Sequence, residues 1–416
     1  MNSKNWLVKI IEEWYKKMNL HTPLVENERV ANRVDYVKNG NSRLIYQLEE
    51  FFQRKYRFRY NLLTEMTEFI RLDSLMEKYY VLTKRELNTI CLEAREQGLN
   101  CWDRDIIRYI ESDRISTYHP FHDYMGTLPL WDGKDRVSEL AVLVSQLPLW
   151  INGFHRWMLA AVAQWMRPET QYANAVAPIL VSQEHGLGKS AFCKSLLPPE
   201  LIDYCTESFD CSDSKSSELK MAEHGLIILD EFDKIPAKKM GSLKNLLQMS
   251  ILKLRKAHQR NYRHLPRIAS FIGTSNFKEL LTDPTGSRRF LCVDVENTIP
   301  KLDIDHKQLY AQLKIEIESG ERYWFSKEEE RAIQKNNRAF CKLSTEESLL
   351  RECFAPASDD EGVKLTAAQI LRIMKRKHPG LLKDATLQGI GMALVAMGIK
   401  KLHRKDNNYY QVIELK

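Results

Sequence analysis

The pattern of apolar and polar positions divides the chain into three stretches of different character. Up to about residue 120, apolar residues recur mostly at helical spacing, as in 42–56 and 83–98. Only 56–72 alternates in the way that a β-hairpin requires. Four short apolar runs follow, separated by helical or polar sequence: 175–183, 225–233, 267–276 and 288–295. Strands that alternate with helices predict a mostly parallel sheet with helices on both of its faces.

The end of the chain has a pattern of its own. After a polar break at 358–362, two helices are predicted at 366–377 and 385–398, followed by two strands around an Asp-Asn-Asn turn. Helices followed by a hairpin are typical of a winged helix. We therefore predict an α/β fold in three domains: a mainly helical N-terminal domain (1–120), a central domain (121–345) and a winged-helix-like domain (355–416). The segment 116–136, rich in Pro, Gly, Tyr and Trp, is predicted to be the linker into the central domain.

Composition and charge are those of a globular protein, with 44% hydrophobic and 28% charged residues among 416. The net charge is +7, and the segment 251–267 alone holds six Lys/Arg and no acid, so the excess is concentrated. The run 387–399 is too short for the roughly 20 residues that a bilayer span needs, and it is predicted to be a buried helix. Eight scattered cysteines without zinc spacing predict free thiols. We expect a cytoplasmic protein that is not bound to a membrane.

The sequence QEHGLGKS (183–190) lies between the first apolar run and a helical stretch. A phosphate-binding loop needs inward-pointing backbone N–H groups and a lysine, and here Lys189 could reach the β- and γ-phosphates while Ser190 binds Mg²⁺. Gln183 stands where the pattern G-x-x-x-x-G-K-[ST] has its first glycine, a position that supplies neither charge nor metal ligand. The predicted nucleotide-binding residues are Gly186, Leu187, Gly188, Lys189, Ser190 and Ala191.

Three further motifs follow at predicted strand ends. Asp230 in LIILDE could hold Mg²⁺ through water, and Glu231 could polarise the attacking water as a general base. Asn276 could sense the γ-phosphate from the next strand. Arg288 or Arg289 in DPTGSRRF could reach the γ-phosphate of a neighbouring subunit, or form an ordinary salt bridge. Together these motifs predict hydrolysis of ATP with Mg²⁺, and the predicted catalytic residues are Lys189, Glu231, Asn276, Arg288 and Arg289.

These strings resemble the virulence-associated protein E family, P-loop ATPases akin to superfamily 3 helicases within the AAA+ group. The resemblance covers about 128–340 and also rests on LPLWDGKDRV (128–137) and LYAQLKIEIESGERYWFSKEEE (309–330). Such proteins typically lie on phages, plasmids and integrated elements and are interpreted as replication helicases. The resemblance implies a P-loop AAA+/superfamily 3-like domain that forms a hexameric ring with ATP between neighbouring subunits. Residues 1–120 show no primase signature.

The resemblance also implies a partner. In superfamily 3 enzymes, the interval between the Glu231 and Asn276 strands carries a hairpin that grips single-stranded DNA in the central pore. Here that interval holds the basic segment 251–267, whose cations would neutralise phosphates while Tyr262 stacks on bases. The predicted DNA contacts are Lys253, Arg255, Lys256, Arg260, Tyr262 and Arg263. A solvated basic helix face is the alternative interpretation of this segment.

Two other basic regions are ambiguous at this point. The tail segments 374–378 and 400–405 could contact DNA phosphates or another subunit. The interleaved cations and aromatics of 53–60 fit a nucleic-acid surface and an amphipathic strand equally well.

We therefore predict an ATP-dependent DNA helicase or translocase of mobile-element replication. Two alternatives remain: a DNA-dependent ATPase that acts as a loader or defence switch without unwinding, and a non-enzymatic winged-helix DNA-binding protein. Intact Lys189, Asp230 and Glu231 argue against the second alternative.

Overall fold

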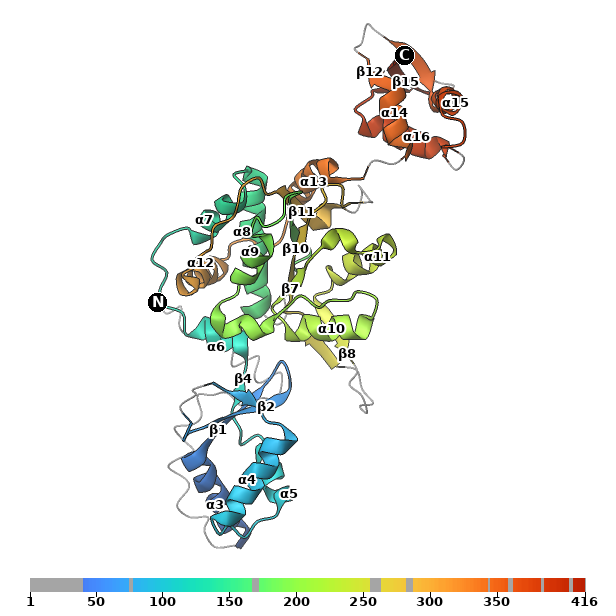
Figure 1. Cartoon of the computed structure of the whole chain (residues 1–416). Helices are drawn as coiled ribbons and strands as arrows, with labels where there is room; N and C mark the ends of the chain where they lie inside the picture. Colours follow the sequence, from blue (N-terminus) through green and yellow to red (C-terminus); the bar gives the residue numbers. More distant parts are fainter. Residues whose placement is uncertain are drawn as a thin grey trace. The chain divides into compact units, whose positions relative to one another are not determined.

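The structure, a computed structural model, describes residues 40–74, 78–166, 172–254, 263–281, 287–342, 345–357, 362–382, 385–403 and 407–415. Its contacts divide the chain into two units, with the boundary between Pro129 and Leu130 (Figure 1). No helix in the described ranges is long and apolar enough to cross a bilayer.

Up to β4, the described residues of the first unit form three helices and a four-stranded sheet of order β3-β2-β1-β4. The helices are α3 (Gly40–Lys55), α4 (Lys84–Glu96) and α5 (Asp103–Ile110), and the strands are β1 (Tyr56–Asn61), β2 (Met66–Arg71), β3 (Tyr80–Val81) and β4 (Thr117–Tyr118). The Thr83 hydroxyl caps α4 by accepting a hydrogen bond from the Glu86 N–H. The predicted helices and the predicted hairpin are present. The predicted linker 116–136 is not simply a loop, because it contains β4 and α6 (Pro120–Gly126).

A parallel five-stranded sheet of order β11-β5-β10-β7-β6 forms the centre of the second unit. Its strands are β5 (Ala177–Val181), β6 (Cys205–Thr206), β7 (Leu226–Leu229), β10 (Ser270–Ser275) and β11 (Phe290–Asp294). Every residue of β5, β7 and β10 is buried, because helices cover both faces of the sheet. This explains why the strands are continuous apolar runs in the sequence. The four longer strands match the predicted ones, whereas β6, with two residues, is too short to give a pattern.

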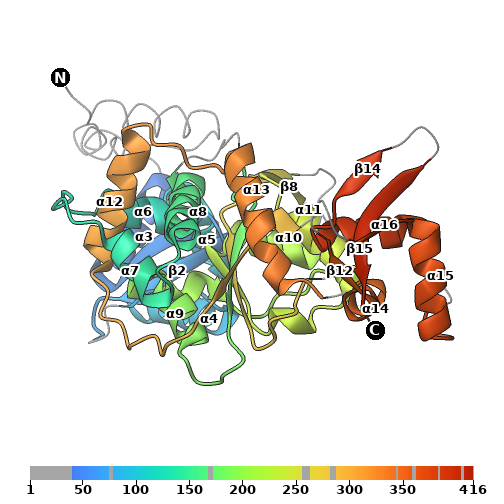
Figure 2. The same ribbon diagram turned by 90° about the horizontal axis from the view of Figure 1, so that it is seen from above.

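Helices cover this sheet in two groups. Figures 1 and 2 show α7, α8, α9 and α12 on one side of the sheet and α10 and α11 on the other. Their bounds are α7 (Arg136–Val144), α8 (Pro148–Met166), α9 (Lys189–Ser195), α10 (Ser214–Glu223), α11 (Ala237–Leu246), α12 (His306–Glu318) and α13 (Lys327–Asn336). Short 3₁₀ turns include η2 (Pro199–Tyr204), η3 (Phe232–Lys234), η4 (Ser287–Arg289) and η5 (Asn337–Phe340).

A buried arginine closes the base of the hairpin formed by β8 (Ile251–Leu254) and β9 (Arg263–Pro266). Arg267 is 1% exposed. Its guanidinium donates to the carbonyls of Ala269 (2.7 Å), Leu247 (2.7 Å), Asn174 (3.0 Å), and Leu246 and Met249 (both 3.3 Å). Burial lowers the pKa of Arg267 to about 9, which still leaves it charged at neutral pH. Arg267 therefore ties the hairpin to the end of α11. Although it belongs to the basic segment 251–267, it is not accessible to DNA.

Residues 345–415 form a small α/β body whose central strand, β15, pairs antiparallel with three others. Its elements are α14 (Thr345–Cys353), β12 (Phe354–Pro356), β13 (Val363–Thr366), α15 (Ala367–Lys377), α16 (Leu387–Ala396), β14 (Lys401–His403) and β15 (Asn408–Glu414). The two predicted helices and the closing hairpin are present, and α14, β12 and β13 are additional. The prediction that 387–399 is a buried helix is only half right, because Leu387, Met392 and Val395 of α16 are 53%, 61% and 52% exposed.

Candidate functional site

The glycine-rich loop joins β5 to α9 and has a backbone that only glycine adopts without strain. Gly186 and Gly188 have φ angles of +79° and +83°. A Cβ on Gly188 would lie 2.9 Å from the carbonyl oxygen of Ile299, so space also excludes a side chain there. The Ile299 N–H donates to the carbonyl of Leu187 at 2.9 Å and holds the loop against the segment after β11. The loop is therefore preformed.

The side chain of Lys189 folds back under this loop. Its ammonium donates to Asn276 Oδ1 at 3.0 Å and to the carbonyls of Ser182 and Glu184, both at 3.4 Å. Lys189 is 7% exposed. Burial lowers its pKa, and the negative charges of Asp230 and Asp233 oppose that shift. The fold thus brings together Lys189 and Asn276, which are 87 positions apart in the sequence.

Ser190 and Asp230 also meet. The Ser190 hydroxyl donates to Asp230 Oδ1 at 3.1 Å, and the Thr274 hydroxyl donates to the same oxygen at 2.5 Å. A hydroxyl and a carboxylate this close could both bind one Mg²⁺, which takes few protein ligands and completes its octahedron with water and phosphate oxygens. Within the described part of the chain, no three or more His, Cys, Asp or Glu side chains lie together in a way that could hold a metal ion.

Glu231 stands at a strained turn immediately after β7. Its φ is +51°, in the left-handed region, where a residue with a Cβ is under strain. Its carboxylate accepts from Lys234 Nζ at 2.5 Å, and its side chain is 47% exposed. Glu231 and Asn276 line one cavity of about 430 Å³, together with Gln183, His185, Asp233, Lys234 and Phe277. We name it the first cavity.

Asp233 is a site residue that the sequence prediction missed. Its Oδ1 accepts from the Ser275 hydroxyl at 2.8 Å and from the Asn276 N–H at 3.3 Å, which fixes Asn276 in front of Lys189. The available signal was a third carboxylate two positions after Glu231, in LIILDEFD.

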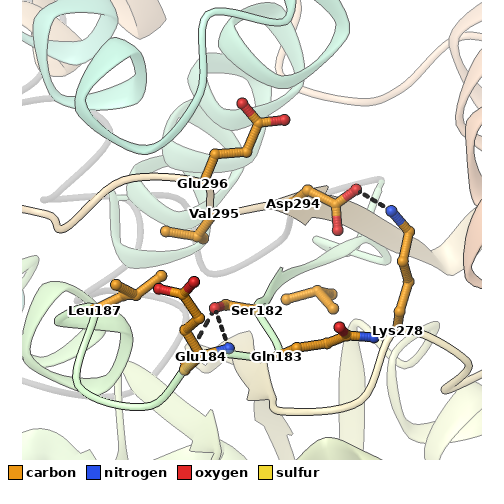
Figure 3. Close-up of a pocket in the computed structure, with 9 residues that line it drawn as sticks. Ser182, Gln183, Glu184, Leu187, Lys278, Asp294, Val295 and Glu296 are labelled. Carbon is orange, nitrogen blue, oxygen red and sulfur yellow. Dashed lines mark hydrogen bonds and ion pairs between the residues drawn. The ribbon is translucent and has the colours of Figure 1, made fainter.

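A second cavity, of about 370 Å³, adjoins the loop at the end of β11 (Figure 3). Its lining residues are Val181, Ser182, Gln183, Glu184, Leu187, Lys278, Asp294, Val295 and Glu296. The Lys278 ammonium pairs with Asp294 at 2.7 Å, and the Ser182 hydroxyl accepts from the Glu184 N–H at 3.1 Å.

The structure does not bring Arg288 and Arg289 to the loop of their own chain. Both lie in η4, just before β11, and β11 is parallel to β5 with Phe290 beside Ala177. The glycine-rich loop follows the opposite end of β5. A strand of five residues spans about 16 Å, so the two arginines lie at the other edge of the sheet. Arg288 pairs there with Glu330 at 3.4 Å.

Most predicted DNA contacts cannot be placed. Arg255, Lys256, Arg260 and Tyr262 lie outside the described residues, as does the side chain of Arg263. Lys253 is exposed on β8, opposite His264 on β9.

The segment 53–60 is only in part an amphipathic strand, because 53–55 end α3 and 56–60 lie in β1. Tyr56 and Phe58 are buried in the core of the first unit. The Arg59 guanidinium lies 3.9 Å and 3.6 Å from the ring centroids of Tyr79 and Tyr118, and it pairs with Glu68 at 2.6 Å. Tyr56, Phe58 and Arg59 are therefore engaged within the first unit, whereas Arg57 is exposed.

The segment WDGKDR (131–136) has a structural role. Gln308 and Gln312 of α12 accept hydrogen bonds from the backbone N–H groups of Asp132 and Arg136, both at 2.9 Å. Arg136 also makes two bonds to the Asp132 carboxylate, at 2.7 and 2.8 Å. The segment thus joins the start of the second unit to α12, which lies more than 170 residues later.

These features define an α/β protein in which a glycine-rich loop, a lysine and an acidic cluster converge at the carboxyl edge of a parallel sheet. The model of the virulence-associated protein E-like domain matches residues 126–342, more than half of the chain, so the chain belongs to this family. The match confirms the family that the motifs indicated. A second model, described as a domain of unknown function from B. Theta (DUF3874), matches residues 344–412. Among curated proteins, none matches this sequence.

Solved structures similar to this chain include the apo structure of the NrS-1 C terminal region (305–718), with 12% sequence identity and a TM-score of 0.45. The A form apo structures of the same region give TM-scores of 0.41 and 0.43 at 12% identity. Each comparison covers 89% of this chain and 99% of the other.

Proposed function

We propose that the protein hydrolyses ATP with Mg²⁺ and uses the energy to move on DNA, as a helicase or translocase of mobile-element replication. The observation that carries the proposal is the convergence of Lys189, Asn276, Ser190 and Asp230. They come from the ends of three neighbouring strands and are joined by hydrogen bonds of 3.0 and 3.1 Å. This is the set of groups that a triphosphate with its metal requires.

Each residue has a role in this proposal. The backbone from Gly186 to Ala191 wraps the phosphates, and Lys189 exchanges its bond to Asn276 for oxygens of the β- and γ-phosphates. Ser190 and Asp230 would hold Mg²⁺, which would neutralise charge on the phosphates. Glu231 accepts the proton of the water that attacks the γ-phosphorus, as the bond to ADP breaks. Asn276, held by Asp233, orients that water.

The site is completed by a neighbouring subunit in this proposal. Arg288 or Arg289 of that subunit contacts the γ-phosphate, and the distance of both arginines from the loop of their own chain supports a role in trans. Subunits arranged in a hexameric ring would line a central pore with the β8–β9 hairpins. Lys253 and the predicted contacts Arg255, Lys256, Arg260, Tyr262 and Arg263 would then bind single-stranded DNA through its phosphates.

The described elements of 345–415 have the order helix, strand, strand, helix, helix, hairpin, which is similar to that of a winged helix with one additional strand. The helix that would enter a DNA groove, α16, has the sequence LQGIGMALVA and carries no charge. Phosphate and base contacts require donors and cations, so this helix favours contact with another subunit over DNA reading.

Steady-state ATP hydrolysis with and without single-stranded DNA tests the proposal. Lys189→Ala should lower kcat by about a hundredfold or more, the scale expected when one preorganised charge is removed from a reacting site. Glu231→Gln should bind ATP without turnover. Lys194→Ala is the matched control, because Lys194 lies in the same helix and pairs with Glu207 on the surface. Equal activity in Lys189→Ala and the control would refute the proposed site.

Mixing experiments test the shared site. Lys189→Ala subunits keep the arginines, and Arg288→Ala or Arg289→Ala subunits keep the loop. Lys189→Ala alone should be inactive, and so should the variant of whichever arginine contacts the γ-phosphate. A mixture of these two variants should recover part of the ATPase activity. No recovery for either arginine would exclude a role in trans. A strand-displacement assay separates the helicase from a loader or switch that hydrolyses ATP without unwinding.

A further inference from the structure

We propose that the second cavity, at the end of β11, binds the nucleoside of the nucleotide, and that it selects ribose over deoxyribose. This inference rests on the proposed function, because it takes the glycine-rich loop to hold the phosphates.

The order of the strands gives the direction of the ligand. Asp230, Glu231 and Asn276 follow β7 and β10, which lie on one side of β5. The γ-phosphate must therefore lie on that side of the loop. β11 is the neighbour of β5 on the opposite side. The second cavity is built mainly from the ends of β11 and β5 and the residues that follow them, with Lys278, after β10, at one wall. A triphosphate that crosses the loop from the first cavity consequently directs its nucleoside toward the second.

The charge of the second cavity fits the uncharged end of a nucleotide. Among the residues that the structure describes, its lining contains the carboxylates of Glu184, Asp294 and Glu296 and one cation, Lys278. Lys278 forms an ion pair with Asp294 at one wall of the cavity, so its positive charge is already balanced by that carboxylate (Figure 3). The excess of negative charge repels phosphate, so the phosphates are excluded from this cavity.

Shape and hydrogen bonding support the same assignment. Val181, Leu187 and Val295 are 1%, 8% and 4% exposed and supply apolar walls against which the faces of a base can pack. Glu184 and Glu296 are exposed at the cavity and, as ionised carboxylates, can only accept hydrogen bonds. The 2′- and 3′-hydroxyls of a ribose are donors that match them. The volume of about 370 Å³ is in the usual range for a small-ligand pocket, about 300–1,000 Å³.

Calorimetric titration of the full chain with ATP, 2′-dATP and inorganic tripolyphosphate tests the inference, in the Glu231→Gln background to prevent turnover. We expect ATP to bind at least about tenfold more tightly than tripolyphosphate, since packing one base face is worth roughly 1–2 kcal/mol. Binding of 2′-dATP should be several-fold weaker than binding of ATP. Val295→Ala should reduce the advantage of ATP over tripolyphosphate. Glu184→Gln or Glu296→Gln should reduce the advantage of ATP over 2′-dATP.

The controls separate the possible failures. Glu279→Gln removes an exposed carboxylate that does not line the cavity and should change neither ratio. Unchanged tripolyphosphate binding in each variant shows that the loop is intact. Equal affinity for ATP and tripolyphosphate, or a Val295→Ala variant that keeps the full difference, overturns the nucleoside pocket but leaves the phosphate site standing. Unchanged preference for ATP over 2′-dATP in both glutamine variants overturns the ribose contact. If neither ATP nor tripolyphosphate binds, the proposed function itself fails.

Discussion

Replacing Arg267 by methionine should destabilise the second unit strongly. The substitution keeps an unbranched apolar stem and removes the guanidinium, so the carbonyls of Leu247, Ala269 and Asn174 lose donors at 2.7, 2.7 and 3.0 Å. Each buried carbonyl left without a donor costs about 1–3 kcal/mol. The Ala269 carbonyl loses less, because it keeps a hydrogen bond from Gln164 Nε2 at 3.0 Å. Removal of the buried charge relieves a desolvation penalty that offsets part of this cost. We expect a net loss of about 3–5 kcal/mol in the free energy of unfolding.

Urea unfolding followed by tryptophan fluorescence measures the effect, because Trp150 and Trp157 are buried in α8 of the same unit. Arg338→Met is the matched control, since Arg338 is exposed and its loss should change stability by less than about 0.5 kcal/mol. Arg267→Lys keeps the charge but not the planar set of donors, and it should lose most of the same stability. If Arg267→Met and Arg338→Met unfold at the same urea concentration as the unmodified protein, the guanidinium does not hold the hairpin base.

Three further predictions concern other parts of the chain. Burial opposes ionisation of Glu93, but hydrogen bonds from Tyr56, Arg71 and Lys55 outweigh it and lower the pKa from 4.5 to about 2. This difference contributes about 3 kcal/mol of stability, present above pH 4.5 and lost as the pH falls toward 2, so acid titration of Glu93→Gln should lack this dependence. Gly273→Ala places a Cβ 2.9 Å from atoms of β5 and β7 and should cost about 1–3 kcal/mol in thermal unfolding, whereas Gly126→Ala, with nothing within 4 Å, should cost less than about 0.5 kcal/mol. Asp233→Ala should lower kcat for ATP hydrolysis, and Asp233→Asn, which keeps an oxygen that can accept from Asn276, should restore part of it; equal rates in both variants would contradict the positioning role.

The sheet and much of the candidate site could be predicted from the sequence because their signals are local. A strand buried on both faces is a continuous apolar run, and the residues that follow it reach the carboxyl edge of the sheet. Lys189, Asp230 and Asn276 could therefore be placed together from three separate motifs, and the hydrogen bonds among Lys189, Asn276, Ser190 and Asp230 agree with that placement.

What could not be predicted depends on contacts between distant segments. Arg267 has the same charge as the other cations of its segment. It becomes a buried anchor through the carbonyls of Leu247 at the end of α11, of Asn174 and of Ala269. Asp233 could not be separated from its acidic neighbours without the position of Ser275. The aromatic residues of 53–60 face a core whose other side comes from α4 and α5, which the segment itself does not reveal.

The bonds from WDGKDR to Gln308 and Gln312 have a consequence for how this domain can be handled. They join the first segment of the domain to α12, a helix near its end, so the two ends of the ATPase candidate are held together. A fragment that starts after Arg136 would remove the 2.9 Å hydrogen bonds that the Gln308 and Gln312 oxygens accept, and Gln312 is 1% exposed. Additional domains, by contrast, can be joined outside these two contacting segments without breaking the bonds between them. Safe cut points for expression or for domain exchange therefore lie before Leu130 and after Lys342.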